Sequence, residues 1–202
     1  MYKKRLTSMS APAKELAKVR DNALLLAVAE GSRQALGELY LGYHRRLVRF
    51  LSRFTSSYET VEEIINDTFL VVWQTAKDFR FASQVSTWII SIAYRTLLKS
   101  LRRQKNHLEA QSLGDHPEQA VDPTSRAEVQ DWLRQGLNQL PVEQRLTLEL
   151  AFHMGHSLQE IATITDCPIG TVKARMFHAR EKLRDYLPAL GGGVPELSER
   201  GE

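Results

Sequence analysis

The 202-residue sequence contains one cysteine, Cys167, and no long apolar run. A lone cysteine excludes an internal disulfide framework, and a membrane-spanning helix would need roughly 20 consecutive apolar residues. Residues 1–21 are basic but lack the apolar middle and cleavage site of a secretory signal, so we expect a flexible leader. These absences favour a protein of the reducing cytoplasm that does not insert into membranes.

Sequence motifs of the common catalytic sites are also absent. There is no glycine-rich phosphate loop, no Gly-x-Ser-x-Gly elbow and no HExxH zinc motif. Glu62 or Glu63 could form an acidic pair with Asp67, but helical periodicity places all three on an exposed face without a pocket. Four potential metal ligands do not have the spacing of a zinc module: His153, His156, Cys167 and His178. We therefore expect no catalytic residues, no metal and no cofactor, and hence no enzyme.

Strand-like alternation of useful length is missing too, which predicts an all-α fold. Helical patterns occupy two stretches, residues 22–105 and 128–187, which we interpret as two small helical domains. Residues 106–127 between them contain prolines and no apolar period, so we predict a flexible acidic linker. The glycine-rich residues 188–202 are expected to form a flexible tail.

Charge is distributed unevenly along a chain whose formal net charge is only +3. Residues 94–105 contain five cations and no carboxylate, whereas residues 107–130 contain five carboxylates and one arginine. Two basic surfaces therefore flank an acidic connector. Repulsion between like charges would extend that connector and keep it away from nucleic acid.

The stretch from Ser157 to Arg184 has the pattern of a helix-turn-helix. Ser157 and Glu160 form a capping box that begins a short helix, and polar residues with Pro168 end it. A second helix starts near Gly170, and its buried side carries apolar residues at helical spacing: Val172, Met176, Ala179 and Leu183. Its solvent side then carries Thr171, Lys173, Ala174, Phe177 and His178. This face could enter a DNA major groove, and the alternative is an ordinary helical hairpin with a solvated basic face.

A preceding helix is expected to support this pair. It restarts at Pro141 and ends at Gly155. Its apolar residues should form the core beneath the helix-turn-helix: Val142, Leu146, Leu148, Leu150, Ala151 and Phe152.

In the first domain, Gly31 ends one helix and Ser32 caps a second, amphipathic helix that runs to Leu51. Thr60 and Glu63 resemble another capping box, which would begin the next helix. One face of that helix is apolar. The opposite face carries Glu62, Glu63, Asn66 and Asp67, either as a solvated surface or as a docking surface for a basic partner.

Residues 79–85 have no clear period and predict a loop whose Phe79 and Phe81 are either core anchors or rings that stack on bases. Ser86 or Thr87 then begins a helix with a buried stripe that includes Ile90. The other side of this helix carries Arg95, Lys99, Arg102 and Arg103. Four cations without an intervening acid favour a phosphate-binding track over a solvated basic face.

Three segments, in this order, resemble the extracytoplasmic-function class of bacterial sigma factors, which direct RNA polymerase to promoters. TVEEIINDTFLVVW resembles the family's core-binding helix, and STWIISIAYRTLLKSLRR resembles its F-R-T-W-L-x-x-I-A-R-N segment. The segment from Leu140 to Arg184 is similar to the family's helix-turn-helix domain, in which P-x-G-T-V-K-S-R is usual. The resemblance covers residues 22–187.

The resemblance implies a role for each surface of the first domain. Glu62, Glu63, Asn66 and Asp67 would bind a coiled coil of the polymerase β′ subunit. The loop with Phe79, Phe81, Ser83 and Gln84 would capture a flipped base of the −10 element. Arg95, Lys99, Arg102 and Arg103 would hold backbone phosphates and assist strand separation.

The second domain would read the −35 element through residues of its last helix: Thr171, Lys173, Ala174, Phe177 and His178, with Arg175 and Arg180 nearer phosphates. The linker would thread through polymerase, which would also be contacted at its β subunit. The family's further implications are a chain that is monomeric when free and is controlled by an anti-sigma factor.

The sequence departs from the family pattern at several of these positions. Arg95 replaces the usual Asn, Lys99 the usual Asp, and Ser91 a commonly basic residue. Ala174 and His178 stand where Ser and Arg are frequent. We therefore expect unusual contacts around the −10 element, and we do not infer the −35 sequence from the family pattern.

Two other functions are compatible with a helix-turn-helix. An autonomous repressor or activator would need a dimerisation surface and a palindromic operator, and the sequence has no obvious zipper. A nucleic-acid enzyme such as a recombinase would need a nucleophile or a metal cluster, and neither is evident.

Overall fold

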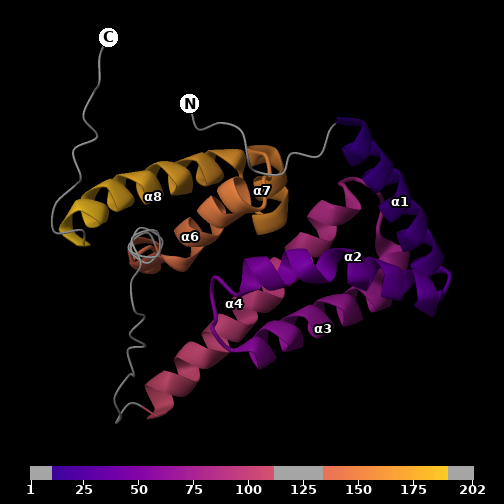
Figure 1. The fold of residues 1–202 in the computed structure, drawn as a ribbon, viewed down its shortest axis with the longest axis horizontal. Coiled ribbons are helices and arrows are strands. Elements are labelled where there is room, and N and C mark those ends of the chain that lie inside the picture. The colour runs from indigo at the N-terminus through magenta and orange to yellow at the C-terminus, as the bar shows by residue number, and fades with distance from the viewer. Residues whose placement is uncertain (1–10, 112–133, 191–202) are drawn as a thin grey trace, which may run out of the picture. The chain divides into compact units, whose positions relative to one another are not determined.

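A computed structural model of the protein describes residues 11–111 and 134–190 (Figure 1). All regular elements in these two ranges are helical, which confirms the predicted all-α class. The chain separates into two compact units, of which the first contains the described helices before Ser112 and the second contains most of the described residues after Leu113. None of the helices in the described ranges is both long enough and apolar enough to cross a bilayer.

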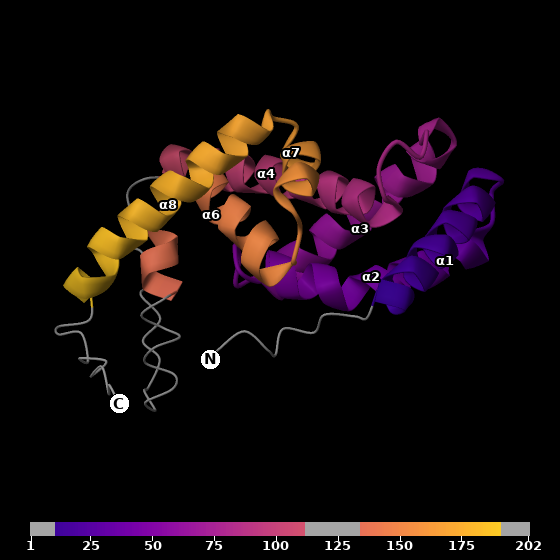
Figure 2. The same cartoon turned by 90° about the horizontal axis from the view of Figure 1, so that it is seen from above.

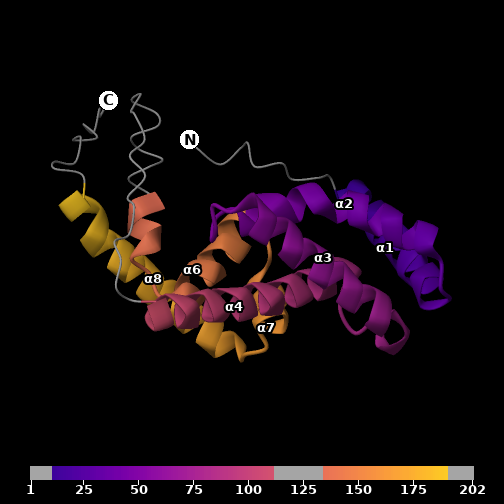
Figure 3. The same cartoon turned by 90° about the horizontal axis from the view of Figure 1, so that it is seen from below.

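The described residues of the first unit form a bundle of four helices and one 3₁₀ turn. These are α1 (Ala11–Ala29), α2 (Arg33–Leu51), α3 (Tyr58–Thr75), the turn η1 (Ala76–Asp78) and α4 (Val85–Gln111). Figure 3 shows α2 and α3 side by side, with α4 packed along α3. Their shared core consists of side chains that are almost fully buried: Leu39, Leu47, Phe50, Ile64, Ile65, Val72, Ile89, Ile90 and Leu97.

Helix α1 is longer than the sequence pattern predicts. It begins at Ala11, so residues 11–21 are helical and the expected flexible leader 1–21 is wrong for that part. The residues added are mostly good helix formers, and Pro12 lies in the first turn, where proline is tolerated. Asp21 is buried and accepts a hydrogen bond from the hydroxyl of Tyr43 on α2, a tertiary contact that local periodicity does not reveal.

The other end of the first unit also extends further than predicted. Helix α4 continues to Gln111, so residues 106–111 are helical although they were assigned to the linker. They include good helix formers and no proline, which explains why the helix continues without an apolar stripe. The remaining predicted linker, residues 112–127, lies outside the described residues.

Two helix starts in the first unit test the predicted caps. Ser32 caps α2 as predicted, after Gly31 with a φ of 94°. The predicted box at Thr60 is wrong, because Oγ of Ser57 accepts the hydrogen bond from the Thr60 amide at 3.1 Å and α3 begins at Tyr58. Two hydroxyl residues three positions apart are both acceptable caps, and the earlier one is used.

The second unit contains residues 134–138 in a helical turn, α6 (Val142–Leu148), a π-helical turn η2 (Glu149–His153), α7 (Leu158–Thr165) and α8 (Ile169–Leu190). Figure 2 shows α6, α7 and α8, of which α6 and α8 are in contact. Part of its core is a cluster of Leu140, Leu148, Met176 and Ala179. Helix α8 runs three residues beyond the predicted boundary at Leu187, and residues 191–202 lie outside the described ranges.

The core prediction for this unit is correct in part. Leu146, Leu148 and Leu150 are buried, but Val142 is 40% exposed and Phe152 is 56% exposed. Val142 is the first residue of α6, where one side of the helix still faces solvent. Phe152 lies in η2, whose wider turn shifts the register, so that a regular 3.6-residue period no longer predicts which side chains are buried.

Candidate partner and nucleic-acid surfaces

The helix-turn-helix is fixed by local hydrogen bonds at each junction. Oγ of Ser157 accepts from the Glu160 amide at 3.2 Å, and Oε2 of Glu160 accepts from the Ser157 amide at 2.8 Å, which confirms the capping box. Asp166 ends α7 in the left-handed region, with a φ of 51°. The Pro168 carbonyl then accepts from the Thr171 amide at 2.8 Å, which starts α8. The geometry of the two helices is therefore set within twelve residues of chain, from Ser157 to Pro168.

Helix α8 presents the predicted face to solvent. Val172 and Ala179 are fully buried, whereas Thr171, Lys173, Ala174, Phe177 and His178 are all exposed. Phe177 is 59% exposed, and its ring centroid lies 5.5 Å from that of His178 in an edge arrangement. An exposed ring between a cation and an imidazole suits contact with bases and phosphates.

The two predicted phosphate-contacting arginines of α8 have different surroundings. Arg175 is half-buried, and its Nη1 lies 3.7 Å from Sγ of Cys167 in the turn. Arg180 is exposed, and its guanidinium carbon lies 5.6 Å from the ring centroid of Phe152. Arg180 is thus the more accessible of the two.

The predicted acidic face of α3 is partly occupied by neighbouring helices. Nε2 of His44 lies 2.9 and 3.2 Å from the two carboxylate oxygens of Glu62, which is half-buried. Nη2 of Arg103 donates to Glu63 at 3.2 Å. Asp67 is exposed and has no hydrogen bond or ion pair with any described residue. Asp67 is therefore the carboxylate most accessible to a partner.

Tyr40 connects this acidic face to α2. Its hydroxyl lies 3.4 Å from Oε2 of Glu62 and 3.4 Å from Oδ1 of Asn66. Burial, and then the neighbouring Glu62 carboxylate, raise the pKa of Tyr40. A hydrogen bond to Glu62 likewise raises the pKa of Tyr58. Both phenols therefore remain neutral donors near neutral pH.

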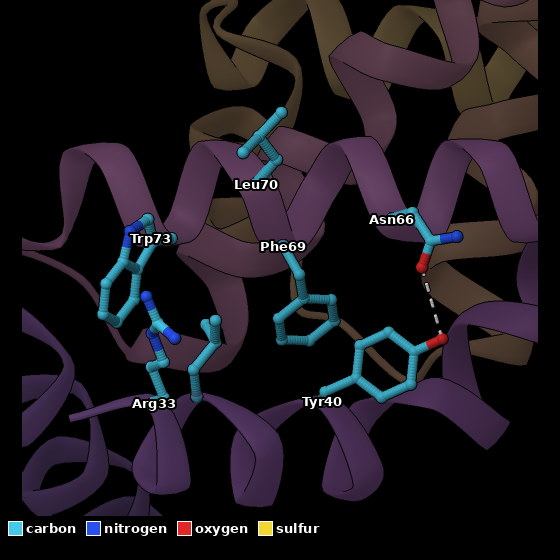
Figure 4. Close-up of a pocket in the computed structure, with 7 residues that line it drawn as sticks. Arg33, Tyr40, Asn66, Phe69, Leu70 and Trp73 are labelled. Atoms are coloured by element: carbon cyan, nitrogen blue, oxygen red, sulfur yellow. Dashed lines mark hydrogen bonds between the residues drawn. The ribbon is translucent and has the colours of Figure 1, made fainter. Parts of the chain in front are cut away.

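A shallow, mainly apolar groove of about 430 Å³ borders the acidic face, and the sequence analysis missed it (Figure 4). The close-up shows Phe69 and Tyr40 between α2 and α3, with Trp73 and Arg33 at one end and Asn66 at the other. The lining residues are Arg33, Leu36, Tyr40, Asn66, Phe69, Leu70 and Trp73. Leu70 is 53% exposed one turn after the acidic residues, and this exposed apolar neighbour is the signal that could have predicted the groove.

The loop before α4 contains an aromatic cluster. The ring of Phe79 lies 4.9 Å from that of Phe81 and 4.7 Å from that of Trp88, measured between centroids. Phe81 is 41% exposed and has a φ of 55°, a left-handed conformation that is uncommon for a bulky residue. Ser83 is half-buried and Gln84 is exposed, and α4 starts at Val85, one residue before Ser86 and two before Thr87, the two predicted starts. Trp88 was not predicted as part of this cluster.

The predicted cationic track on α4 is exposed along its whole length. Arg95, Lys99, Arg102 and Arg103 all face solvent. Nη2 of Arg95 donates to Oγ of Ser91 at 3.4 Å, and Arg103 pairs with Glu63. Within the described ranges neither Lys99 nor Arg102 pairs with a carboxylate. The track is available to an anionic ligand.

No three potential metal ligands among His, Cys, Asp and Glu come together in the described part of the chain. Nδ1 of His156 instead lies 3.8 Å from Oε1 of Glu160. The chemistry of these surfaces is that of charge, stacking and hydrogen bonding.

Comparisons with known proteins match both units. A family model for Sigma-70 region 2 matches residues 39–107, and a model for Sigma-70 region 4 matches residues 130–183. The chain is 34% identical over 177 residues to the ECF RNA polymerase sigma factor SigM of Mycobacterium tuberculosis (strain ATCC 35801 / TMC 107 / Erdman). That alignment covers 87% of this chain and 89% of the relative.

Two solved structures have a similar fold. CnrH, in complex with the cytosolic domain of CnrY, has a TM-score of 0.64 and 22% identity, covering 84% of this chain and 98% of CnrH. The sigma factor RpoE of Bartonella quintana, in complex with the anti-sigma factor NepR, has a TM-score of 0.61 and 24% identity, covering 75% of this chain and 95% of RpoE. At these identities the structures support the two-domain helical fold.

Proposed function

The chain belongs to the extracytoplasmic-function family of RNA polymerase sigma factors, as its three motifs predicted, and we propose that its two helical units divide promoter recognition between them. The first unit, which contains α1 to α4, binds core polymerase and opens the −10 element. The second unit, which contains α8, binds the −35 element. Polymerase performs the chemistry, so this chain acts by recruitment, without a catalytic group or cofactor of its own, in the cytoplasm where promoter DNA lies.

The docking surface for polymerase combines charge and shape. The acidic residues Glu62, Glu63, Asn66 and Asp67 bind the coiled coil of the β′ subunit, and the neighbouring groove accepts an apolar side chain of the same partner. The observation that supports this best is the exposed Asp67 carboxylate one turn from the exposed Leu70. Charge brings the partner to this face, and burial of the groove's apolar surface holds it there.

The aromatic loop and α4 together bind the −10 element. Phe79 and Phe81, with Ser83 and Gln84 beside them, form a surface on which an unpaired base stacks, because aromatic rings bind any base face. The cations Arg95, Lys99, Arg102 and Arg103 hold the backbone of the separated strand. Trp88 contacts the ring of Phe79 and helps to hold it in place.

Helix α8 enters the major groove of the −35 element. Phe177 and His178 contact base edges, and Phe177 is suited to the methyl group of thymine. Lys173 and Arg180 contact phosphates, and the less exposed Arg175 lies nearer the phosphates than the bases. Thr171 and Ala174 lie on the same exposed face of α8 and contact the DNA there. Anionic DNA and the exposed cations of α8 are complementary in charge.

The two similar solved structures suggest how the chain is regulated. The RpoE relative is in complex with an anti-sigma factor, and CnrH is in complex with the cytosolic domain of CnrY. We propose that this chain, monomeric when free, also has an anti-sigma factor, which competes with polymerase.

One experiment tests the proposed function. The purified chain is added to core RNA polymerase with a promoter library, and run-off transcripts are sequenced. Transcripts that require the chain are the expected result. Failure to bind core polymerase, or binding of a palindromic site by the chain alone as a dimer, would contradict the proposal and favour an autonomous helix-turn-helix regulator.

A further inference from the structure

Phe152 is exposed at a position where helical periodicity predicts burial. The main cause is the π-helical turn Glu149–His153, in which the Met154 amide donates to the Glu149 carbonyl at 3.0 Å. Single π-helical turns occur frequently at functional sites. Because Phe152 is 56% exposed, the fold loses the stabilisation that full burial of this ring would provide. An exposed ring at this turn therefore suggests a role in binding.

Among the described residues, the cationic neighbour of the ring is Arg180 of α8. The guanidinium carbon of Arg180 lies 5.6 Å from the ring centroid of Phe152, within the range of a cation–π contact. In the described part of the chain no carboxylate pairs with Arg180, whereas the nearby Arg184 donates to Glu181 at 2.8 Å. Arg180 is thus held by the uncharged ring of Phe152, and its positive charge remains available to an anion outside the described residues.

We propose that Phe152 is a positioning residue for DNA binding, whose ring holds the Arg180 guanidinium where it meets a backbone phosphate. The inference rests on the proposed function in one respect, namely that α8 faces DNA. Phe152 acts through Arg180 and does not itself contact the nucleic acid.

The physical basis is pre-organisation. A free arginine side chain has many rotamers, and ordering it at a phosphate opposes binding. Stacking on a ring restricts the guanidinium before DNA arrives and leaves its N–H donors at the edge free to bind phosphate. An apolar residue of similar size without a ring would fill the space but would not orient the charge.

A double-mutant cycle tests this inference in the full-length chain. The variants are Phe152→Leu, Phe152→Tyr, Arg180→Ala and the Phe152→Leu/Arg180→Ala pair, with Val142→Ala as a matched control because Val142 is 40% exposed in the same unit. The probe is a short mixed-sequence duplex, whose binding is measured by fluorescence anisotropy over a series of salt concentrations. A phosphate contact does not depend on base sequence, so this probe works even if the chain proves not to bind polymerase.

We expect Phe152→Leu to weaken binding by about two- to fivefold, the factor that an exposed contact between a cation and a ring provides. Phe152→Tyr and Val142→Ala should retain the affinity, and all variants should keep the melting temperature. In the Arg180→Ala background, Phe152→Leu should have no further effect, and Arg180→Ala itself should reduce the salt slope by about one.

Three results of the binding experiment would overturn the inference. Phe152→Leu could bind with unchanged affinity, Arg180→Ala could leave affinity and salt slope unchanged, or the two losses could add. Additive losses would mean that the ring touches the nucleic acid directly. The Arg180 side-chain NMR resonance in the free chain gives an independent measurement, since loss of the ring in Phe152→Leu should move it downfield, and an unmoved resonance would show that the contact is absent in solution.

Discussion

Nη2 of Arg103 lies 3.2 Å from Oε1 of Glu63, although the two residues are 40 positions apart in the chain. The contact joins α4 to α3, and therefore joins the proposed DNA-binding track to the proposed polymerase-binding face. Both side chains are largely exposed, at 74% and 53%, and exposed pairs of this kind contribute at most about 1 kcal/mol. Polymerase or DNA can therefore displace the pair at little cost.

Asp67, which has no such partner in the described part of the chain, provides the sharpest test of the polymerase-binding face. We predict that Asp67→Arg weakens association with core polymerase by about tenfold or more, because it places a cation against a basic partner. The same change at Glu63 should have a smaller effect, since Glu63 is already paired with Arg103. Association is measured by anisotropy with a labelled chain.

Glu30→Arg is the matched control, because Glu30 is an exposed carboxylate just after α1 and belongs neither to the acidic face nor to the residues that line the groove. It should leave polymerase association unchanged. Equal weakening by Glu30→Arg and Asp67→Arg would mean that only net charge matters, and the proposed docking face would then be wrong.

Tyr43 and Asp21 provide a test of folding in the first unit. Tyr43→Phe removes the hydroxyl that donates to the buried Asp21 carboxylate. Since a buried carboxylate that loses a donor is destabilising, we predict a loss of about 1–3 kcal/mol in the free energy of unfolding, measured with urea. Tyr58→Phe should have a much smaller effect, because Tyr58 is 66% exposed.

The same pair predicts a pH dependence. Burial, and then the bond to Asp21, raise the pKa of Tyr43 well above its ordinary value of 10.0. In the unfolded chain the phenol ionises near that ordinary value, so stability is retained below about pH 10 and falls as the pH rises further. The wild type should lose about 1.4 kcal/mol per pH unit more than Tyr43→Phe in this range. If the unfolding free energies of the two proteins changed in parallel with pH, ionisation of Tyr43 would not be the cause of the loss of stability.

The helix-turn-helix could be predicted almost completely from sequence because its determinants are local. Ser157, Glu160 and Asp166 fix the ends of α7 through bonds within a few residues, and the apolar spacing from Val172 to Ala179 fixes the buried side of α8. The four acidic-face residues and the four α4 cations were likewise placed on the predicted sides of their helices. Their functional roles remain predictions.

The remaining features depend on contacts or turns that a helical period does not encode. The burial of Asp21 against Tyr43 is a tertiary contact between α1 and α2, and the groove beside the acidic face exists only because α2 and α3 pack side by side. The π-helical turn reverses the expected burial of Phe152. The left-handed backbone at Phe81 was not foreseen either, since phenylalanine gives no signal for it.

Substitutions at Phe81 can separate the backbone strain at this residue from the contribution of its ring to DNA binding. Its φ of 55° is a conformation that glycine adopts without strain and that costs other residues about 1–2 kcal/mol. Phe81→Gly and Phe81→Ala both remove the ring, but only alanine keeps the strained Cβ. We therefore predict that Phe81→Gly unfolds in urea with a free energy about 1 kcal/mol higher than that of Phe81→Ala.

Both Phe81 variants should bind single-stranded −10 DNA less tightly in the polymerase complex, since one stacked base contributes about 1–3 kcal/mol. A fluorescent base analogue in the oligonucleotide reports the stacking. If the two variants were equally stable, the backbone at Phe81 would not be strained. If both bound the oligonucleotide like the wild type, the ring would not be a stacking surface.

Lys173 and Phe177 are both exposed on α8, and their replacement should change different properties of DNA binding. Lys173→Gln removes a phosphate contact, so we predict a uniform loss of affinity across promoters and a salt slope shallower by about one. Phe177→Leu keeps the charge but changes the apolar contact with base edges, so the salt slope should persist while the selected −35 sequences change. Competition among promoters in the library, measured with polymerase bound to each variant, separates the two effects. A change in promoter choice with Lys173→Gln, or an unchanged choice with Phe177→Leu, would contradict the proposal that base recognition on α8 depends on the ring and phosphate binding on the cation.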